Sequence, residues 1–260
     1  MNPRPELPFA SVVVPTFQRP DELKHALQSV LAQKESSWEA LVIDDGQGEG
    51  IAVAEALGDI RIRALPNSGR GQVDARNTAI VMARGEYLCW LDDDDWWQDS
   101  DHLGLLRRHA AQSPALFHRG GWLVDEEDRH EVFAWSATPQ SLRENNTILT
   151  SSIAYPRALH RALGLLDSTL NGYCDWDWLL RLCQAGTPVR MLPGLAIGYR
   201  VHRGGVSADP QRPEWTRLFE RLRLKHGLTC QVHNHATMAR ELAATGASEP
   251  RPTGDAAPGA

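Results

Sequence analysis

The sequence predicts an α/β fold with a mostly parallel central sheet flanked by helices. Between residues 9 and 97, short apolar runs rich in β-branched residues alternate with amphipathic stretches of helical period. Such alternation is typical of parallel strands joined by right-handed crossovers. Three of the apolar runs end in polar or acidic residues. Ligands of such sheets bind outside the carboxyl ends of the strands, so these residues should face one crevice.

The first half of the chain has the clearest elements. Pro20 suits the first turn of a helix, Asp21 and Glu22 are favourable near its positive end, and the apolar residues that follow have helical spacing. We expect strands at residues 9–14, 38–43, 60–65 and 87–91, and helices at 20–31, 51–57 and 73–83.

The second half is less regular. We expect helices at residues 103–111, 155–166, 175–184 and 215–226, and strands at 115–124, 131–135 and 195–201. Small and polar residues dominate toward the end of the chain, which predicts a disordered tail over 243–260. The remainder is interpreted as a single domain over 1–235, divided into halves at 9–97 and 98–235.

Composition and charge narrow the classes of function. The 260 residues are 42% hydrophobic and 23% charged, as in an ordinary globular protein. The net charge of -6 and pI near 5.9 argue against a nonspecific nucleic-acid binder, which needs a basic surface. The four cysteines form no CxxC pair, so neither zinc nor a disulfide framework is expected. Residues 1–5 lack an apolar signal core and no run of about 18 apolar residues occurs. We therefore expect a cytoplasmic protein without a transmembrane segment, with peripheral membrane contact left open.

Four consecutive aspartates follow the expected strand at 87–91. Successive side chains of a strand point to opposite faces, and a buried carboxylate loses its water, so the strand must end at Leu91 and release Asp92, Asp93, Asp94 and Asp95 into a cleft or solvent. Close like charges repel one another, and a divalent cation relieves that cost. Oxygen ligands favour Mg2+ or Mn2+. The alternative is a solvated acidic turn.

Four motifs in order resemble the inverting family 2 glycosyltransferases of GT-A fold. They are VVVPTFQRP at 12–20, the strand at 38–43 with its Asp-Asp-Gly end at 44–46, Asn-Ser-Gly at 67–69 with Ala-Arg-Asn at 75–77, and the acidic motif at 91–97. The resemblance covers roughly residues 11–207. It implies a Rossmann-like nucleotide-binding half and an acceptor-binding half around the predicted sheet.

The resemblance also implies a site for a nucleotide-diphosphate sugar, with a UDP-sugar as the expected donor. The implied donor-binding residues are Pro15, Thr16, Phe17, Arg19, Asp44, Asp45, Asn67, Gly69, Arg76, Asp92 and Asp93. Asp45 or Asp44 would accept the uracil N3–H, while the other forms the turn before Gly46. Arg76 either reaches a phosphate or forms a surface ion pair.

A divalent cation completes the implied donor site. Asp92, Asp94 and Asp95 would hold Mn2+ or Mg2+, which neutralises charge on the departing diphosphate. His202 lies in a glycine-rich loop and is either a further ligand to the metal or diphosphate or an ordinary loop histidine.

The general base implied by the resemblance is Asp175. The stretch from Cys174 resembles the family's Glu-Asp motif at the start of a helix, with Cys174 in the place of the glutamate. At about 100° per residue, Asp175 lies on the side of the apolar stripe, whereas Asp177 points toward Arg181 four residues on. An N-cap is the alternative role for Asp175. Three tryptophans beside these motifs either stack on an acceptor sugar or pack in the core: Trp96, Trp97 and Trp176.

The expected function is therefore metal-dependent transfer of one sugar, with inversion, to a hydroxyl of a saccharide or glycolipid acceptor. Cell-surface polysaccharide or glycoconjugate biosynthesis is the expected setting. Two alternatives remain at this point. A nucleotidyltransferase would share the sheet and acids but needs a glycine-rich loop after the first strand, and residues 16–19 contain no glycine. A non-catalytic sugar- or metal-binding module would keep the acids without a base.

Overall fold

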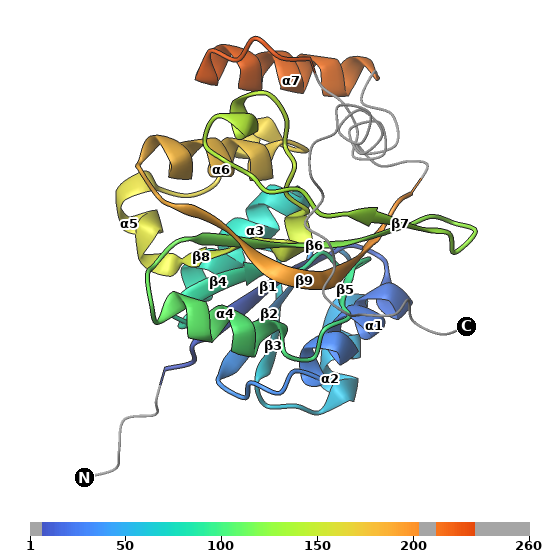
Figure 1. Cartoon of the computed structure of the whole chain (residues 1–260). Coiled ribbons are helices and arrows are strands. Elements are labelled where there is room, and N and C mark those ends of the chain that lie inside the picture. Colours follow the sequence, from blue (N-terminus) through green and yellow to red (C-terminus); the bar gives the residue numbers. More distant parts are fainter. Residues whose placement is uncertain (1–6, 203–211, 232–260) are drawn as a thin grey trace.

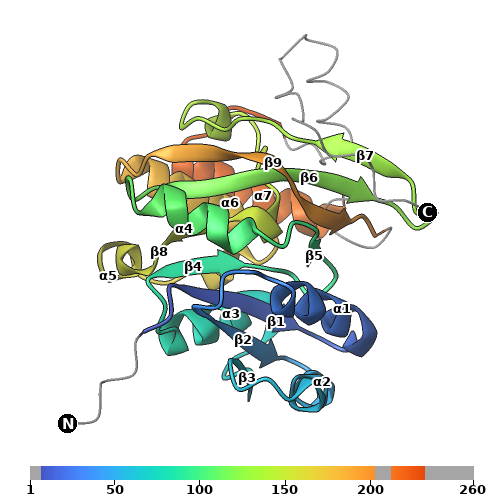
Figure 2. The ribbon, with the colours of Figure 1, turned by 60° about the horizontal axis from the view of Figure 1, so that its bottom comes forward.

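A nine-stranded mixed sheet runs through the molecule and carries helices on both faces (Figures 1 and 2). The computed structural model describes residues 7–202 and 212–231. The strands follow the order β3-β2-β1-β4-β8-β6-β9-β5, and β7 pairs with β6 outside this path.

The first half forms the parallel part of the sheet. Its strands are β1 (Ala10–Thr16), β2 (Trp38–Asp44), β3 (Ile62–Pro66) and β4 (Tyr87–Trp90). Its helices are α1 (Pro20–Leu31), α2 (Glu49–Leu57) and α3 (Gly71–Met82). β1 is central and pairs in parallel with β2 and β4. The carboxyl ends of β1, β2 and β4 therefore lie side by side.

The second half continues the same sheet with mixed strand directions. Its strands are β5 (Trp96–Trp97), β6 (Leu116–Val124), β7 (His130–Phe133), β8 (Ala154–Pro156) and β9 (Val189–Arg200). Its helices are α4 (His102–Ala110), α5 (His160–Leu163), α6 (Cys174–Gln184) and α7 (Pro213–His226). β8 joins the halves because it pairs antiparallel with both β4 and β6.

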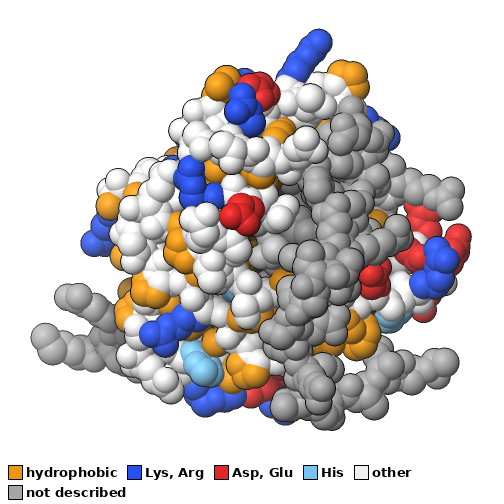
Figure 3. All heavy atoms as spheres, turned by 45° about the horizontal axis from the view of Figure 1, so that its top comes forward, with side chains coloured by type: hydrophobic (Ala, Val, Ile, Leu, Met, Phe, Trp, Pro, Cys, Tyr) orange, Lys and Arg blue, Asp and Glu red, His pale blue; other side chains and the backbone are white. Residues whose placement is uncertain are grey.

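Two hydrophobic clusters fill the two faces of the sheet. Val12 and Val14 of β1 belong to the cluster that includes residues of α1, α2 and α4, and Val13 belongs to the cluster on the other face, with residues of α3, α6 and α7. The alternation follows from the period of two in a strand. Figure 2 shows α6 and α7 on the same side as α3. On the face that carries α7, basic and acidic side chains of the visible described part are interspersed rather than gathered in one basic patch (Figure 3).

Most predicted elements are confirmed, with ends that differ by a few residues. The predicted helix at 155–166 is wrong in its first part, where β8 occupies Ala154–Pro156 and only His160–Leu163 is α-helical. Tyr155 is drawn into the sheet opposite Leu88, and its hydroxyl accepts a hydrogen bond from Trp90 Nε1 at 3.2 Å. Pro156 has no N–H to donate to a strand partner, and β8 ends at this residue.

Two further differences concern the second half. β9 begins at Val189, six residues before the predicted strand, because it pairs along the length of β6. β5 was not predicted; the Trp96 ring fits against Gly198 of β9, where a Cβ would approach it to 2.1 Å. The predicted tail at 243–260 lies outside the described residues. Among the described helices, none combines the length and apolar character needed to cross a membrane.

Candidate active site

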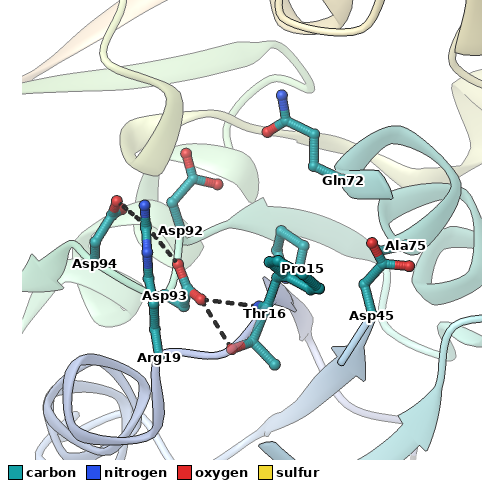
Figure 4. Close-up of a pocket in the computed structure, with 10 residues that line it drawn as sticks. Pro15, Thr16, Arg19, Asp45, Gln72, Ala75, Asp92, Asp93 and Asp94 are labelled. Atoms are coloured by element: carbon teal, nitrogen blue, oxygen red, sulfur yellow. Dashed lines mark hydrogen bonds and ion pairs between the residues drawn. The ribbon is translucent and has the colours of Figure 1, made fainter. Parts of the chain in front are cut away.

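A pocket opens where β1, β2 and β4 end, as the sheet pattern predicts. It has a volume of about 220 Å³ and is lined by Pro15, Thr16, Phe17, Arg19, Asp45, Gln72, Ala75, Asp92, Asp93 and Asp94. Figure 4 shows Asp45 on one side of Thr16 and the acidic run on the other. Seven of the residues predicted to bind the donor therefore line one cavity, together with Asp94 from the predicted metal set.

The two aspartates at the end of β2 have different roles. Asp44 is buried and accepts hydrogen bonds from the backbone N–H groups of Gly46 (2.7 Å) and Gly50 (2.9 Å), so it fixes the turn into α2. Asp45 lines the pocket, and it accepts from Asn67 Nδ2 (2.7 Å) and the N–H of Gly71 (2.8 Å). Asp44 is therefore the turn-former of the pair, and Asp45 faces the ligand space.

The Asn67–Gly69 turn supports Asp45 from behind. Asn67 Oδ1 accepts the N–H of Gly69 at 3.1 Å, which leaves its amide nitrogen directed to Asp45. A Cβ at Gly69 would lie 2.5 Å from the Asp74 side chain, so only glycine fits this turn without movement. These two predicted residues thus shape the pocket through Asp45.

Asp93 joins the acidic run to the loop after β1. Its Oδ2 accepts from Thr16 Oγ1 at 2.8 Å and from the N–H of Phe17 at 3.3 Å, and Arg19 Nη1 lies 3.3 Å from its Oδ1. Burial, reinforced by repulsion from Asp94, raises the pKa of Asp93 to about 6 despite the hydrogen bond from Thr16. Asp93 therefore links the acidic run to Thr16 and Arg19 in the pocket lining (Figure 4).

Asp94 is held between two cationic or potentially cationic side chains. It forms an ion pair with Arg19, and His202 Nε2 lies 3.1 Å from its Oδ2. Burial would raise the pKa of Asp94, but His202 and Arg19 outweigh it, so the pKa lies below its ordinary value. The structure therefore places the predicted residue His202 at the pocket's acidic end.

Asp92 contacts the buried residue Arg76. The Arg76 side chain is 2% exposed, donates to Asp92, and lies over the Trp90 ring. Burial raises the pKa of Asp92 while Arg76 opposes the rise. The alternative of a surface ion pair for Arg76 is wrong, since its guanidinium is enclosed between the acidic run and α6, where its Nη1 lies 3.8 Å from Cys174 Sγ.

Asp95 turns away from the other three acids. It is 2% exposed and accepts hydrogen bonds from the hydroxyl of Ser151 and from the backbone N–H of Arg200 (2.9 Å). Burial, with repulsion from Asp94 and Asp92, raises the pKa of Asp95 well above its ordinary value. Asp95 thus ties the acidic loop to the second half rather than lining the pocket.

The chemistry of the remaining donors suits a hard divalent cation. Asp92 and Asp94 bring carboxylate oxygens to the pocket, and such oxygens are the ligands that Mg2+ and Mn2+ prefer. Within residues 7–202 and 212–231, no group of three or more His, Cys, Asp or Glu side chains is already arranged as a metal site. Arg19 and Arg76 neutralise the two carboxylates instead. The case for a metal site here therefore rests on the chemistry of these carboxylate oxygens.

Asp175 lies in the first turn of α6, as predicted, with its carboxyl enclosed although the residue is only half-buried. Its Oδ2 accepts from Asn146 Nδ2 at 3.0 Å and from Thr150 Oγ1 at 3.3 Å. Burial raises the pKa of Asp175 above its ordinary value, against the opposing effects of the Trp176 N–H and the Arg76 charge. A raised pKa suits a proton acceptor.

Asp177 points toward Arg181, as predicted, with 3.0 Å between Oδ2 and Nε. The helix angle alone did not reveal that α7 covers this side of α6. Asp177 is fully buried, and its Oδ1 lies 2.7 Å from both Lys225 Nζ and His226 Nε2. Trp97 and Trp176 are also buried, which supports the core-packing alternative for them, while Trp96 stacks on His25.

Several site residues carried no sequence signal of their own. Gln72 lines the pocket and accepts from Arg76 at 3.0 Å; Asn146, Thr150 and Ser151 contact the acids from a loop without a motif. Only Gln72 could have been found, because it lies between the Asn-Ser-Gly motif at 67–69 and the predicted helix at 73–83.

Comparison with known proteins agrees with this geometry. The sequence model described as "Glycosyl transferase family 2" matches residues 11–157. YwdF of Bacillus subtilis, an uncharacterized glycosyltransferase, is 27% identical over 232 residues, which are 84% of this chain and 84% of YwdF. WcaA of Escherichia coli K12, a putative colanic acid biosynthesis glycosyl transferase, is 37% identical over 187 residues, or 70% of this chain and 62% of WcaA.

Solved structures share the fold at low identity. Residues 1–349 of TarS from S. aureus, in complex with UDP-GlcNAc, match with a TM-score of 0.67 and 14% identity, covering 83% of this chain and 66% of that one. The mannosyltransferase PcManGT from Pyrobaculum calidifontis, in complex with GDP-Man and Mn2+, matches with a TM-score of 0.60 and 19% identity over 95% of this chain and 78% of that one. The family match covers more than half of the chain, and the fold and the acid-lined pocket agree with it. The chain belongs to glycosyl transferase family 2 and is a glycosyltransferase of GT-A fold.

Proposed function

We propose that the chain transfers one sugar from a UDP-sugar to an acceptor hydroxyl, with inversion, in the synthesis of a cell-surface polysaccharide or glycoconjugate. The observation that carries the proposal is a single pocket with Asp45 at one end and the acidic run Asp92–Asp94 at the other. A nucleoside diphosphate suits both ends: its base offers a hydrogen-bond donor to Asp45, and its negative phosphates would bind the acidic run through a divalent cation.

The names of relatives support the setting. WcaA is assigned to colanic acid biosynthesis, and TuaG of Bacillus subtilis to teichuronic acid biosynthesis. WfaP of Escherichia coli, 23% identical over 207 residues, is named as a UDP-Glc:alpha-D-GlcNAc-diphosphoundecaprenol beta-1,3-glucosyltransferase. A lipid-linked saccharide is therefore the acceptor class that we propose first.

The nucleoside would lie between Asp45 and the loop after β1. Asp45 accepts the N3–H of uracil, while Pro15 and Thr16 form the wall beside it. Phe17 is 54% exposed at the pocket, so its ring is available to cover a planar base. The pocket's volume of about 220 Å³ is below the usual range for a whole ligand, which fits the nucleotide part alone.

The diphosphate would lie toward the acidic end. Asp92 and Asp94 would hold Mn2+ or Mg2+, with His202 beside Asp94, and such an ion neutralises charge on a leaving diphosphate. Arg19 is 42% exposed at this end and can turn from Asp94 to a phosphate oxygen, whereas the buried Arg76 keeps Asp92 in place.

Asp175 is the proposed general base. It accepts the proton of the acceptor hydroxyl as that oxygen bonds to the anomeric carbon and the bond to the diphosphate breaks. The enclosed carboxyl and its raised pKa support this role. An N-cap role does not describe Asp175, because Tyr173 is the N-cap residue and Asp175 lies inside the first turn of α6.

A donor screen with base variants tests the proposal. UDP-glucose, UDP-GlcNAc, GDP-mannose and a dTDP-sugar are incubated with and without Mn2+, and thermal shift and nucleotide release are measured. A UDP-sugar should give the largest shift and turnover. Asp175→Asn should keep donor binding and lose about two to four orders of magnitude in turnover, the usual effect of positioned acid–base catalysis. Preference for a GDP-sugar, or full turnover by Asp175→Asn, would contradict the assignment.

A further inference from the structure

A short turn with no role in the proposed reaction contacts both acidic motifs. This is the 3-10 turn η2 (Thr150–Ser152), which precedes β8. Thr150 donates to Asp175 Oδ2 at 3.3 Å, and the next residue, Ser151, donates to Asp95. The acid at the start of α6 and the acid loop after β4 are thus joined through two neighbouring residues.

On the side of α6, the contact fixes one oxygen of the proposed base. Asn146 reaches the same atom as Thr150, Asp175 Oδ2, at 3.0 Å. Among the described residues, no side chain donates to Asp175 Oδ1. Asn146 is itself held, because its Oδ1 accepts the N–H of Ile148 at 3.2 Å. Both side-chain donors therefore hold the carboxylate through Oδ2.

On the side of the donor pocket, the contact is made by a fully buried hydroxyl. Ser151 has no exposed surface; its Oγ also accepts the backbone N–H of Asp92 at 3.0 Å, and its carbonyl accepts from Trp97 Nε1 at 3.0 Å. Ser151 thus contacts both ends of the acidic run. A displacement of η2 would move the Asp92 backbone and the Asp175 carboxylate together.

We propose that residues 146–151 are a positioning element for the base, holding Asp175 Oδ2 so that Oδ1 meets the acceptor hydroxyl at a fixed distance from the donor pocket. The proposal rests on the proposed function, and it assigns Asn146, Thr150 and Ser151 as positioning residues. Small errors in the placement of a base are costly, since a misplacement of about 1 Å can lower a rate by about a hundredfold.

The surroundings of Asp175 give the proposal a second readout. The charged and titratable groups that face it are Arg76 from α3, Asp92 from the loop after β4, and its neighbours Tyr173 and Cys174. Burial raises the pKa of the Cys174 thiol to about 12, so it stays neutral. The hydrogen bond from Thr150 favours the carboxylate form. Its loss should therefore raise the pKa of Asp175 further.

The test compares two hydroxyl deletions in the same turn. Thr150→Val removes the bond to Asp175, and Ser152→Ala removes a hydroxyl that donates only to the backbone carbonyl of Leu149, at 2.7 Å. Turnover is measured with the most active of UDP-glucose, UDP-GlcNAc and GDP-mannose. Thr150→Val should lower kcat by about ten- to a hundredfold, leave the donor KM unchanged, and move the acidic limb of the pH profile to higher pH. Thr150→Ser should restore both.

An activity-independent measurement separates this inference from the proposed function. In protein labelled with carboxyl-13C aspartate, the Asp175 resonance is identified by its loss in Asp175→Asn and titrated. Its pKa should rise in Thr150→Val and stay unchanged in Ser152→Ala. Equal effects of the two deletions, or an unchanged pKa in Thr150→Val, would overturn the positioning role. Activity that survives in Asp175→Asn would instead overturn the base assignment on which it rests.

Discussion

The cluster around Asp177 predicts an effect on stability that distinguishes Asp177 from the neighbouring proposed base, Asp175. Asp177→Asn removes a fully buried charge that contacts Arg181, Lys225 and His226. Asparagine keeps the volume and one acceptor oxygen, so the packing of α6 against α7 is preserved. What is lost is the negative charge that balances the cations beside it.

The expected cost follows from how well those cations are satisfied without Asp177. Removing one partner of a buried ion pair costs about 3–5 kcal/mol. Lys225 is 36% exposed and keeps Asp167 at 2.8 Å, and Arg181 keeps two carbonyl acceptors, at Leu163 and Leu165. The lower end of that range is therefore appropriate, about 3 kcal/mol. For a domain of this size that corresponds to a fall in Tm of roughly 6–12 °C.

The assay is thermal unfolding, with donor binding and turnover measured well below the transition. Asp167→Asn is the matched control, because Asp167 also pairs with Lys225 but at a partly exposed position. Its loss should lower the free energy of unfolding by about 1 kcal/mol or less. Donor affinity and turnover of folded Asp177→Asn should equal those of the wild type. A Tm within 2 °C of the wild type (about 0.5–1 kcal/mol by the same scaling), or lost turnover in the folded variant, would refute the reasoning.

The difference in Tm between the wild type and Asp177→Asn should depend on pH in one direction only. Burial acts to raise the pKa of Asp177, but His226 and Lys225 outweigh it, so its pKa in the folded state lies below the ordinary value. Its contribution is therefore complete above about pH 4, the value for an unfolded aspartate, and is lost as the pH falls through the lower folded value. The Tm gap between wild type and Asp177→Asn should narrow only below about pH 4.

Two further predictions concern the donor pocket. Asp45→Ala should weaken UDP binding by about 1–3 kcal/mol in calorimetry and leave the binding of inorganic diphosphate unaffected. Equal losses for both ligands would show that Asp45 does not contact the base. The control Asp44→Ala removes the acceptor for the start of α2 and should lower Tm instead. EDTA should abolish transfer and Mn2+ or Mg2+ restore it, while Asp94→Ala loses transfer but not Tm; full activity in excess EDTA would contradict the metal proposal.

Local patterns predicted the first half of the fold because its elements form from nearby residues. The helical period after Pro20 and the apolar run of β2 each fall within a dozen residues. The prediction at β8 was wrong for the opposite reason. Its backbone state depends on pairing with β4, nearly seventy residues earlier, and a three-residue strand leaves no periodicity of its own.

The site shows the same division between local and distant information. The acids and their place at the strand ends follow from the sequence, but four consecutive aspartates are chemically identical. Their separate roles depend on partners far along the chain: Thr16 for Asp93, Ser151 for Asp95. For the pair at the end of β2, Asp44 becomes the turn-former only because α2 begins where its oxygens can reach.

The antiparallel pairing of β8 with β4 has a practical consequence for engineering the second half of the chain. β4 leads into the acidic loop, and β8 begins two residues after η2 ends, so the positions of the acidic run and of η2 both depend on one ladder of backbone hydrogen bonds. The β6–β7 hairpin projects away from that ladder (Figure 2). We therefore expect exchange of the hairpin tip at residues 125–129 between relatives to leave the spacing between the acidic run and Asp175 unchanged.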